Sequence, residues 1–230
     1  MKKKITLTKE QISEVEDYLT NKKVKYVDVR FEILDHIILD IEFLIKNKKI
    51  TFKEAFEDIK IKWNKNLKSR SNWLIGYGNY GPSIFINRCL EIYKPLLYKI
   101  LLSMVVFIAV LYSVNKSFNY SLFNFKKGIS LTIFIGLLLY IGLVLFWYIK
   151  MKLRKVNTAY SYLYRKKIMP NLFSVLIFNP YINNSFITQE NKFNVIMLTM
   201  LFLFFLTALE GRYFYKKHLE LVFRYKSILN

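Results

Sequence analysis

Long stretches without charged residues constrain this chain more than any other sequence feature. In the clearest, Ile129 to Ile149, 21 consecutive residues include no Asp, Glu, Lys or Arg. A helix needs about 20 apolar residues to cross the hydrocarbon layer of a bilayer, so this segment predicts a transmembrane helix. Pro95 to Val114 predicts another, with only Lys99 near one end, and Phe193 to Leu209 is a shorter span.

A fourth segment, residues 168–188, also lacks charge but contains Pro170 and the pairs Asn179-Pro180 and Asn183-Asn184. Its composition fits either a crossing or a re-entrant segment. The positions of Lys and Arg favour a crossing. With four spans, 14 flanking basic residues lie on the cytoplasmic side and four lie outside. With three spans, nine lie on the cytoplasmic side and eight lie outside. We therefore expect a multi-pass protein of the cell membrane with both termini in the cytoplasm.

The amino-terminal residues carry the starts of three amphipathic helices. Thr8 with Gln11 and Thr51 with Glu54 each fit a capping box, and Asp28 is expected to cap the helix between them. Apolar residues follow each start at helical spacing, which predicts a small bundle. The core stripe of the middle helix is expected to contain Phe31, Leu34, Ile37, Ile38, Ile41, Leu44 and Ile45.

The expected fold class is all-α, with a small cytoplasmic helical module followed by a four-helix transmembrane bundle. We divide the chain into the module at 1–81, a juxtamembrane helix at 82–94, the four-span region at 95–209 and a basic cytoplasmic tail at 210–230.

Two local features join the module to the membrane region. Residues 64–81 are rich in Asn, Ser, Gly and aromatic residues, so we expect an irregular linker near the membrane surface. Aromatic side chains such as Trp63 and Trp73 are expected to rest among lipid headgroups. Pro95 is expected to kink or break the entry into the first span.

Residues 5 to 66 contain the runs Thr6-Leu-Thr-Lys-Glu-Gln-Ile12, Asp28-Val-Arg-Phe-Glu-Ile-Leu-Asp-His36, Ile41-Glu42, Thr51-Phe-Lys-Glu-Ala-Phe56 and Trp63-Asn64. This order resembles the amino-terminal module of a family of uncharacterised bacterial membrane proteins. More distantly, it is similar to HAAS-type helical domains, which precede transmembrane helices and are often encoded beside PadR-like regulators. The resemblance implies membrane-associated signalling or regulation and assigns no catalytic residue.

The most suggestive polar cluster is Glu32, Asp35, His36 and Asp40. Spacings of four and eight residues place three of them on one helix face, where their oxygen and nitrogen atoms could bind a divalent metal. The alternative is a structural or partner-contact role, because acidic residues near a helix start favour its dipole. We prefer partner contact and expect neither a metal nor another cofactor.

No arrangement of residues predicts catalysis. Cys89 has no His nearby in the sequence, and the chain contains no phosphate-binding loop or metalloprotease motif, so we do not expect an enzyme. Asn179, Asn183 and Asn184 are candidates for a polar membrane site if they break the third span, as in transporters. A kinked helix with these groups turned inward is the preferred alternative.

The net charge of +20 initially suggests nucleic-acid binding. However, many of the basic residues lie next to the spans, so anionic lipid headgroups are the expected partner and nucleic acid is not. A protein partner is expected through residues 1–81, and a homo-oligomer is left open. The predicted function is a regulatory or signalling membrane protein, or a subunit of a membrane complex. The alternative is a small transport or channel component.

Overall fold

Helices make up most of the described chain, which confirms the all-α class. The structure is a computed structural model that describes residues 6–76, 80–117, 126–177 and 194–229. It divides into two compact units. Unit 1 contains Met1–Glu91, Val156–Ala159 and Leu221–Asn230, and unit 2 contains Ile92–Lys155 and Tyr160–Glu220.

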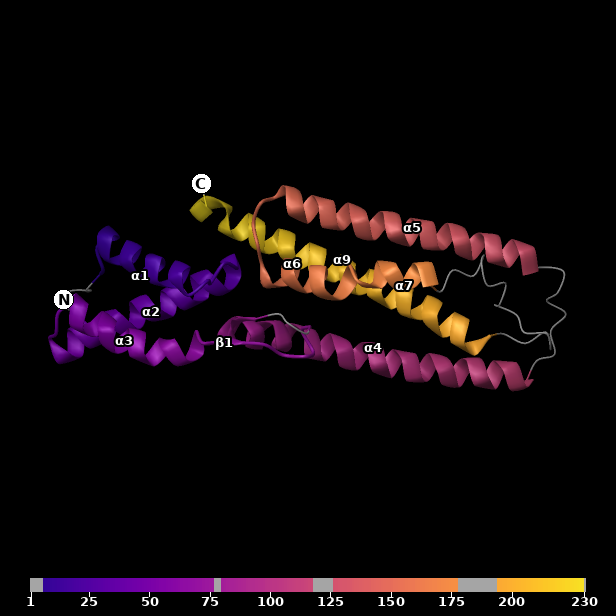
Figure 1. Cartoon of the computed structure of the whole chain (residues 1–230), viewed down its shortest axis with the longest axis horizontal. Coiled ribbons are helices and arrows are strands. Elements are labelled where there is room, and N and C mark those ends of the chain that lie inside the picture. Colours follow the sequence, from indigo (N-terminus) through magenta and orange to yellow (C-terminus); the bar gives the residue numbers. More distant parts are fainter. Residues whose placement is uncertain (1–5, 77–79, 118–125, 178–193, 230) are drawn as a thin grey trace. The chain divides into compact units, whose positions relative to one another are not determined.

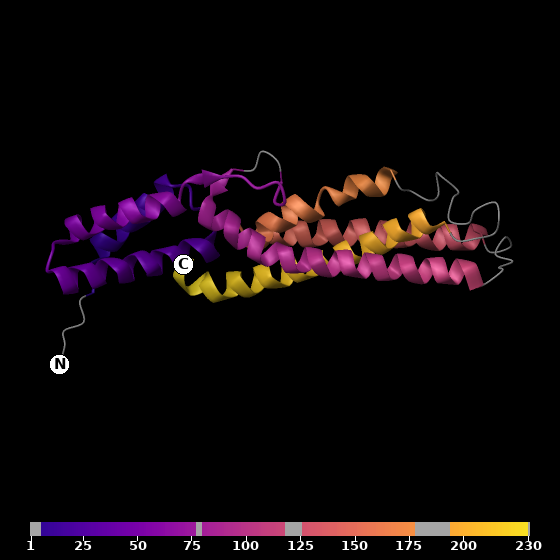
Figure 2. The ribbon, with the colours of Figure 1, turned by 90° about the horizontal axis from the view of Figure 1, so that it is seen from below.

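Unit 1 is built around α1 (Lys9–Asn21), α2 (Val27–Lys48) and α3 (Phe52–Asn66), which lie side by side in Figures 1 and 2. Both capping boxes are confirmed. The Thr8 hydroxyl accepts a hydrogen bond from the Gln11 N–H at 3.3 Å, and the Thr51 hydroxyl accepts one from the Glu54 N–H at 3.4 Å. These bonds satisfy N–H groups that have no partner within their own helices.

The core of unit 1 is apolar and well enclosed. Ile33, Ile37 and Ile41 of α2 are completely buried, as are Val15 and Leu19 of α1. Removing a side chain of this size from water contributes about 1.5–3 kcal/mol. The predicted stripe of α2 is confirmed only in part. Its members Leu34, Ile37 and Ile41 are buried, whereas the other four are half-buried, and the buried face also contains Val29 and Ile33, which the stripe did not include.

The start of α2 differs from the prediction. Its N-cap residue is Tyr26, not Asp28, and Tyr26 makes no side-chain capping bond. Both carboxylate oxygens of Asp28 instead accept the N–H of Ala159 at 3.1 Å, and the Val27 N–H donates to the Asn157 carbonyl at 2.9 Å. Asp28 lies within the first helical turn, and its carboxylate binds a partner distant in sequence that local spacing cannot reveal.

The segment after α3 is more ordered than an irregular linker. Strand β1 (Ser69–Arg70) pairs antiparallel with β2 (Gly81–Pro82), and Ile75 between them is completely buried. Trp63 is also buried, so its predicted place among headgroups is wrong because it belongs to the core face of α3. Trp73, in contrast, is largely exposed.

Among the residues that the structure describes, three helices are long and apolar enough to cross a membrane, which indicates a membrane protein. They are α4 (Ser83–Ser117), α5 (Lys126–Leu153) and α9 (Val195–Leu229), all labelled in Figure 1. Helix α4 does not break at Pro95, which lies inside it. Proline removes one backbone donor, and the remaining hydrogen bonds of a long helix can continue around it. The predicted juxtamembrane helix and basic tail are therefore parts of α4 and α9.

The predicted fourth crossing is only partly described. Helix α6 (Ala159–Leu163) leads into a π-helix, η2 (Tyr164–Ile168), and α7 (Asn171–Ile177) follows. The rest of the predicted crossing lies outside the described residues, together with its polar candidates Asn179, Asn183 and Asn184. The fourth crossing stays a prediction.

Candidate functional site

One face of α2 is exposed and carries most of the predicted contact residues. Glu32, Asp35 and His36 are exposed there. Leu39 and Phe43 are also exposed, to 61% and 64%. Residues 32, 36, 39 and 43 follow the spacing of one helix face. We call Glu32, Asp35, His36, Leu39 and Phe43 the α2 face.

Asp40, the fourth predicted residue, does not belong to the α2 face. Its carboxylate accepts from Lys62 Nζ at 2.7 Å and from Trp63 Nε1 at 3.4 Å, both on α3. Asp40 therefore joins α2 to α3, while Glu32, Asp35 and His36 remain at the surface. Within the described ranges, no group of three or more His, Cys, Asp or Glu side chains is arranged to hold a metal ion.

A second candidate site lies inside unit 2 and was not predicted from the sequence. Glu210 of α9 is only 7% exposed, and its Oε1 atom has no hydrogen-bond partner among the residues that the structure describes. An ionised carboxylate is costly to bury without partners, so such a group is a candidate functional residue in a membrane helix.

Two further side chains complete this site, and we call Glu210, Lys167 and Tyr93 the Glu210 cluster. The ammonium group of Lys167 lies over the ring of Tyr93, 4.6 Å from its centre, in a cation–π contact. Burial lowers the pKa of Lys167, whereas the nearby charge of Glu210 acts in the opposite direction. The cluster thus combines one acidic, one basic and one aromatic group from α9, η2 and α4.

Close helix packing positions the cluster. At Gly211, a Cβ atom would lie 3.3 Å from the Tyr164 ring, 3.4 Å from Ile168 and 3.7 Å from Trp147. This close approach brings the backbone of α9 against η2, where Lys167 lies. The Tyr164 hydroxyl donates to the Val144 carbonyl at 2.8 Å and so ties η2 to α5. π-Helical turns are rare and occur often at functional sites.

The chemistry available differs between the two sites. The α2 face offers apolar contact with acidic groups nearby, which suits protein binding. The Glu210 cluster can hold a proton or a cation in a largely apolar setting, but it lacks the nucleophile and base pair of a hydrolase. No family model, curated protein or solved structure matches this chain.

Proposed function

We propose that this protein is a membrane-bound regulatory or signalling component whose amino-terminal helical module binds a partner protein on the cytoplasmic side. The observation that carries the proposal is the α2 face, where Leu39 and Phe43 remain exposed in a module with a well-packed core. Large apolar side chains next to one another on a folded surface often mark a binding site. The resemblance of residues 5 to 66 to HAAS-type modules favours the same role.

The charges on the α2 face suggest the chemistry of the partner. Glu32 and Asp35 lie about one to three turns before Leu39 and Phe43 on the exposed side of α2. A partner surface with an apolar centre and basic residues at its rim would complement this arrangement. Aromatic and aliphatic anchors supply most of the binding energy in such interfaces, and the rim charges mainly set specificity.

Photo-crosslinking in intact cells tests the proposal. A photoreactive amino acid replaces Leu39 or Phe43 in the full-length chain, and a control replaces Glu14, which is exposed on α1. We expect a discrete adduct at positions 39 and 43 and none at position 14. The double charge reversal Glu32→Lys and Asp35→Lys should weaken the adduct. Absence of an adduct at both test positions, or an equal adduct at position 14, would refute the proposal.

We further propose four crossings, because α5 and α9 run in the same direction. Tyr140 of α5 hydrogen-bonds Thr207 of α9 at 3.1 Å, and further along both helices Trp147 stacks with Tyr215 at 6.2 Å between ring centres. If both helices cross the membrane in one direction, the chain must return between them. This supports a crossing between α5 and α9.

Cysteine labelling tests this topology. In a Cys89→Ala background, single cysteines at Lys155 and Gln189 lie on opposite sides of the proposed fourth crossing. A maleimide that does not enter cells should label position 189 on intact cells, and position 155 only after permeabilisation. Labelling of both positions from the same side would contradict four crossings.

A transport function is the second candidate, and the buried Glu210 carboxylate is the observation that favours it. Ionisable groups inside membrane helices often lie on ion or proton pathways. Vesicles containing the purified protein should then pass protons or monovalent cations faster than empty vesicles. Glu210→Gln should abolish this flux, whereas Glu220→Gln, at an exposed position of the same helix, should not. Flux equal to that of empty vesicles would exclude the candidate.

A further inference from the structure

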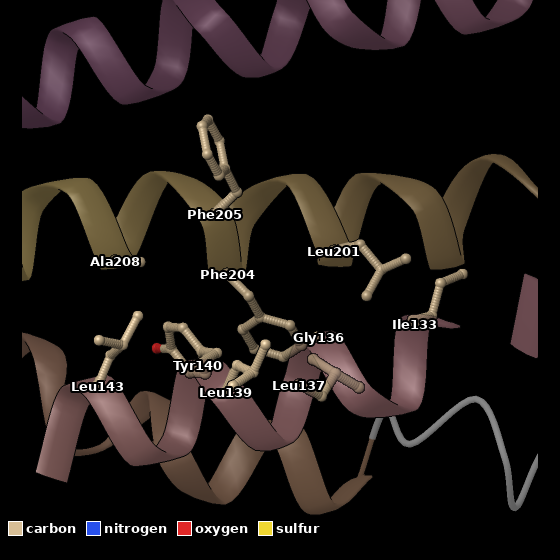
Figure 3. Close-up of a pocket in the computed structure, with 10 residues that line it drawn as sticks. All are labelled: Ile133, Gly136, Leu137, Leu139, Tyr140, Leu143, Leu201, Phe204, Phe205 and Ala208. Carbon is tan, nitrogen blue, oxygen red and sulfur yellow. The ribbon is translucent and has the colours of Figure 1, made fainter. Parts of the chain in front are cut away.

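An open apolar groove of about 320 Å³ lies between α5 and α9 in unit 2. Figure 3 shows side chains of the two helices facing one another, with Phe204 reaching from α9 toward α5. Leu137, Tyr140 and Phe204 are buried at its base, and Leu139 and Leu143 are exposed at its edge. The volume falls within the range of small-ligand sites.

Two small residues contribute to this shape. Gly136 lies in the groove and has nothing within 4 Å of the place where a side chain would begin. Ala208 lines the groove from α9. The groove is therefore open because the residues at these two positions are small.

The groove lies in the apolar part of α5. Along α5 it runs from Ile133 to Leu143, which corresponds to about 15 Å of helix within the uncharged run from Ile129 to Ile149. The whole groove therefore lies at the depth of the hydrocarbon layer. Because both helices are apolar and long enough to cross a membrane, lipid acyl chains are the molecules that surround this groove.

Basic residues continue both walls of the groove at the same end. On α5, Lys150 comes two helical turns after Leu143, and on α9, Arg212 comes about one turn after Ala208. Both side chains are exposed. The stacked rings of Trp147 and Tyr215 lie near the same level, as expected for aromatic residues at the headgroups. Two cations next to an acyl-chain groove match a lipid phosphate.

We propose that this groove binds one acyl chain of an anionic phospholipid, whose phosphate is held by Lys150 and Arg212. The proposal assigns a specific lipid site to unit 2. It depends on the membrane location of α5 and α9 and is independent of whether the α2 face binds a protein.

Photolabelling tests the site in the full-length protein. Phosphatidylcholine nanodiscs contain a trace of phospholipid with a photoreactive acyl chain, carrying either a phosphatidylglycerol or a phosphatidylcholine headgroup. Mass spectrometry then compares labelling at Leu139 and Leu143 in the groove with labelling at Leu138, which is exposed elsewhere on α5. Each basic residue near an anionic lipid surface adds a similar favourable contribution to binding. Two such residues predict a roughly 30-fold preference for phosphatidylglycerol over phosphatidylcholine in the groove. No preference is expected at Leu138.

Matched variants separate the acyl chain from the phosphate. Gly136→Leu fills the groove and should abolish selective labelling, whereas Gly142→Leu, also in open space but outside the groove, should not. The double variant Lys150→Gln and Arg212→Gln should keep groove labelling but lose the headgroup preference. The double variant Lys152→Gln and Lys155→Gln removes the same amount of positive charge. It should keep the headgroup preference, because Lys152 lies two and a half turns after Leu143.

Three results would overturn the proposal. Equal labelling of the groove and Leu138 would mean that only bulk lipid contacts the helices. Crosslinks from groove residues to a second copy of the chain, with no lipid label, would identify the occupant as protein. Unchanged headgroup preference after loss of Lys150 and Arg212 would remove the proposed phosphate contacts.

Discussion

The close packing of α9 at Gly211 makes a quantitative prediction. A Cβ atom there would already lie 3.3 Å and 3.4 Å from carbon atoms of Tyr164 and Ile168, and 3.7 Å from Trp147. Gly211→Ala therefore requires a shift of only a few tenths of an ångström. The better helix propensity of alanine, about 1 kcal/mol, offsets this cost, so we expect little change in the free energy of unfolding.

Gly211→Leu should behave differently, because three more carbon atoms must fit where the first one is already crowded. Overpacking of this kind costs about 1–3 kcal/mol, and the crowding on three sides favours the upper end. After the gain in helix propensity, we expect a net loss of about 2 kcal/mol. Gly142→Leu is the control, since nothing lies within 4 Å of that position, and it should not destabilise the protein.

The assay is reversible unfolding of the full-length protein in mixed micelles with increasing SDS, followed by tryptophan fluorescence. Trp147 is suited as a reporter because it lies beside Gly211. The proposed packing predicts the order of stability Gly142→Leu at or above wild type, Gly211→Ala near wild type and Gly211→Leu lowest. If Gly211→Leu unfolds at the same SDS fraction as Gly142→Leu, then α9 does not pack against η2 and α5 as described.

Three further predictions concern unit 1. Thr51→Ala removes a helix cap and should lower the free energy of unfolding by about 1 kcal/mol in denaturant titrations. Asp40→Asn should destabilise unit 1 by less than about 1 kcal/mol through its contacts with α3, whereas Asp35→Asn at the surface should have no effect. Burial raises the pKa of Asp28, although the N–H of Ala159 opposes this, so the folded state binds the proton more readily than the unfolded state. The free energy of unfolding of the wild type should therefore fall relative to that of Asp28→Asn as the pH rises through the pKa that Asp28 has in the folded state. A difference between the two free energies that stays constant with pH would contradict this.

Local signals account for the parts of the fold that the sequence predicts. The capping boxes at Thr8 and Thr51 are confirmed because the hydroxyl and its partner N–H lie only three residues apart. The long spans are predictable because the hydrocarbon layer excludes charge over about 20 residues. Asp28 shows the limit, since its partner Ala159 is 131 residues away.

Local sequence signals do not reveal the Glu210 cluster. Tyr93, Lys167 and Glu210 come from three separate elements, and no local spacing connects them. The one local signal was that Glu210 directly follows a long apolar run. The sequence-based boundary at Leu209 assigned that residue to a tail, whereas α9 continues without interruption to Leu229. Glu210 is therefore part of a continuous helix, and the close packing of α9 beside it at Gly211 accounts for its burial.

The lengths of α4 and α9 explain how a membrane helix can also belong to unit 1. Each has 35 residues, or about 52 Å, which exceeds the hydrocarbon thickness of ~30 Å by more than 20 Å. Charged residues concentrate before Ile100 in α4 and after Gly211 in α9, so the excess length lies at these two ends. The last turns of α9 accordingly fall within unit 1, where Tyr225 stacks with Phe31 at 4.9 Å between ring centres. The excess length at these ends thus explains why each of the two helices contributes residues to both compact units.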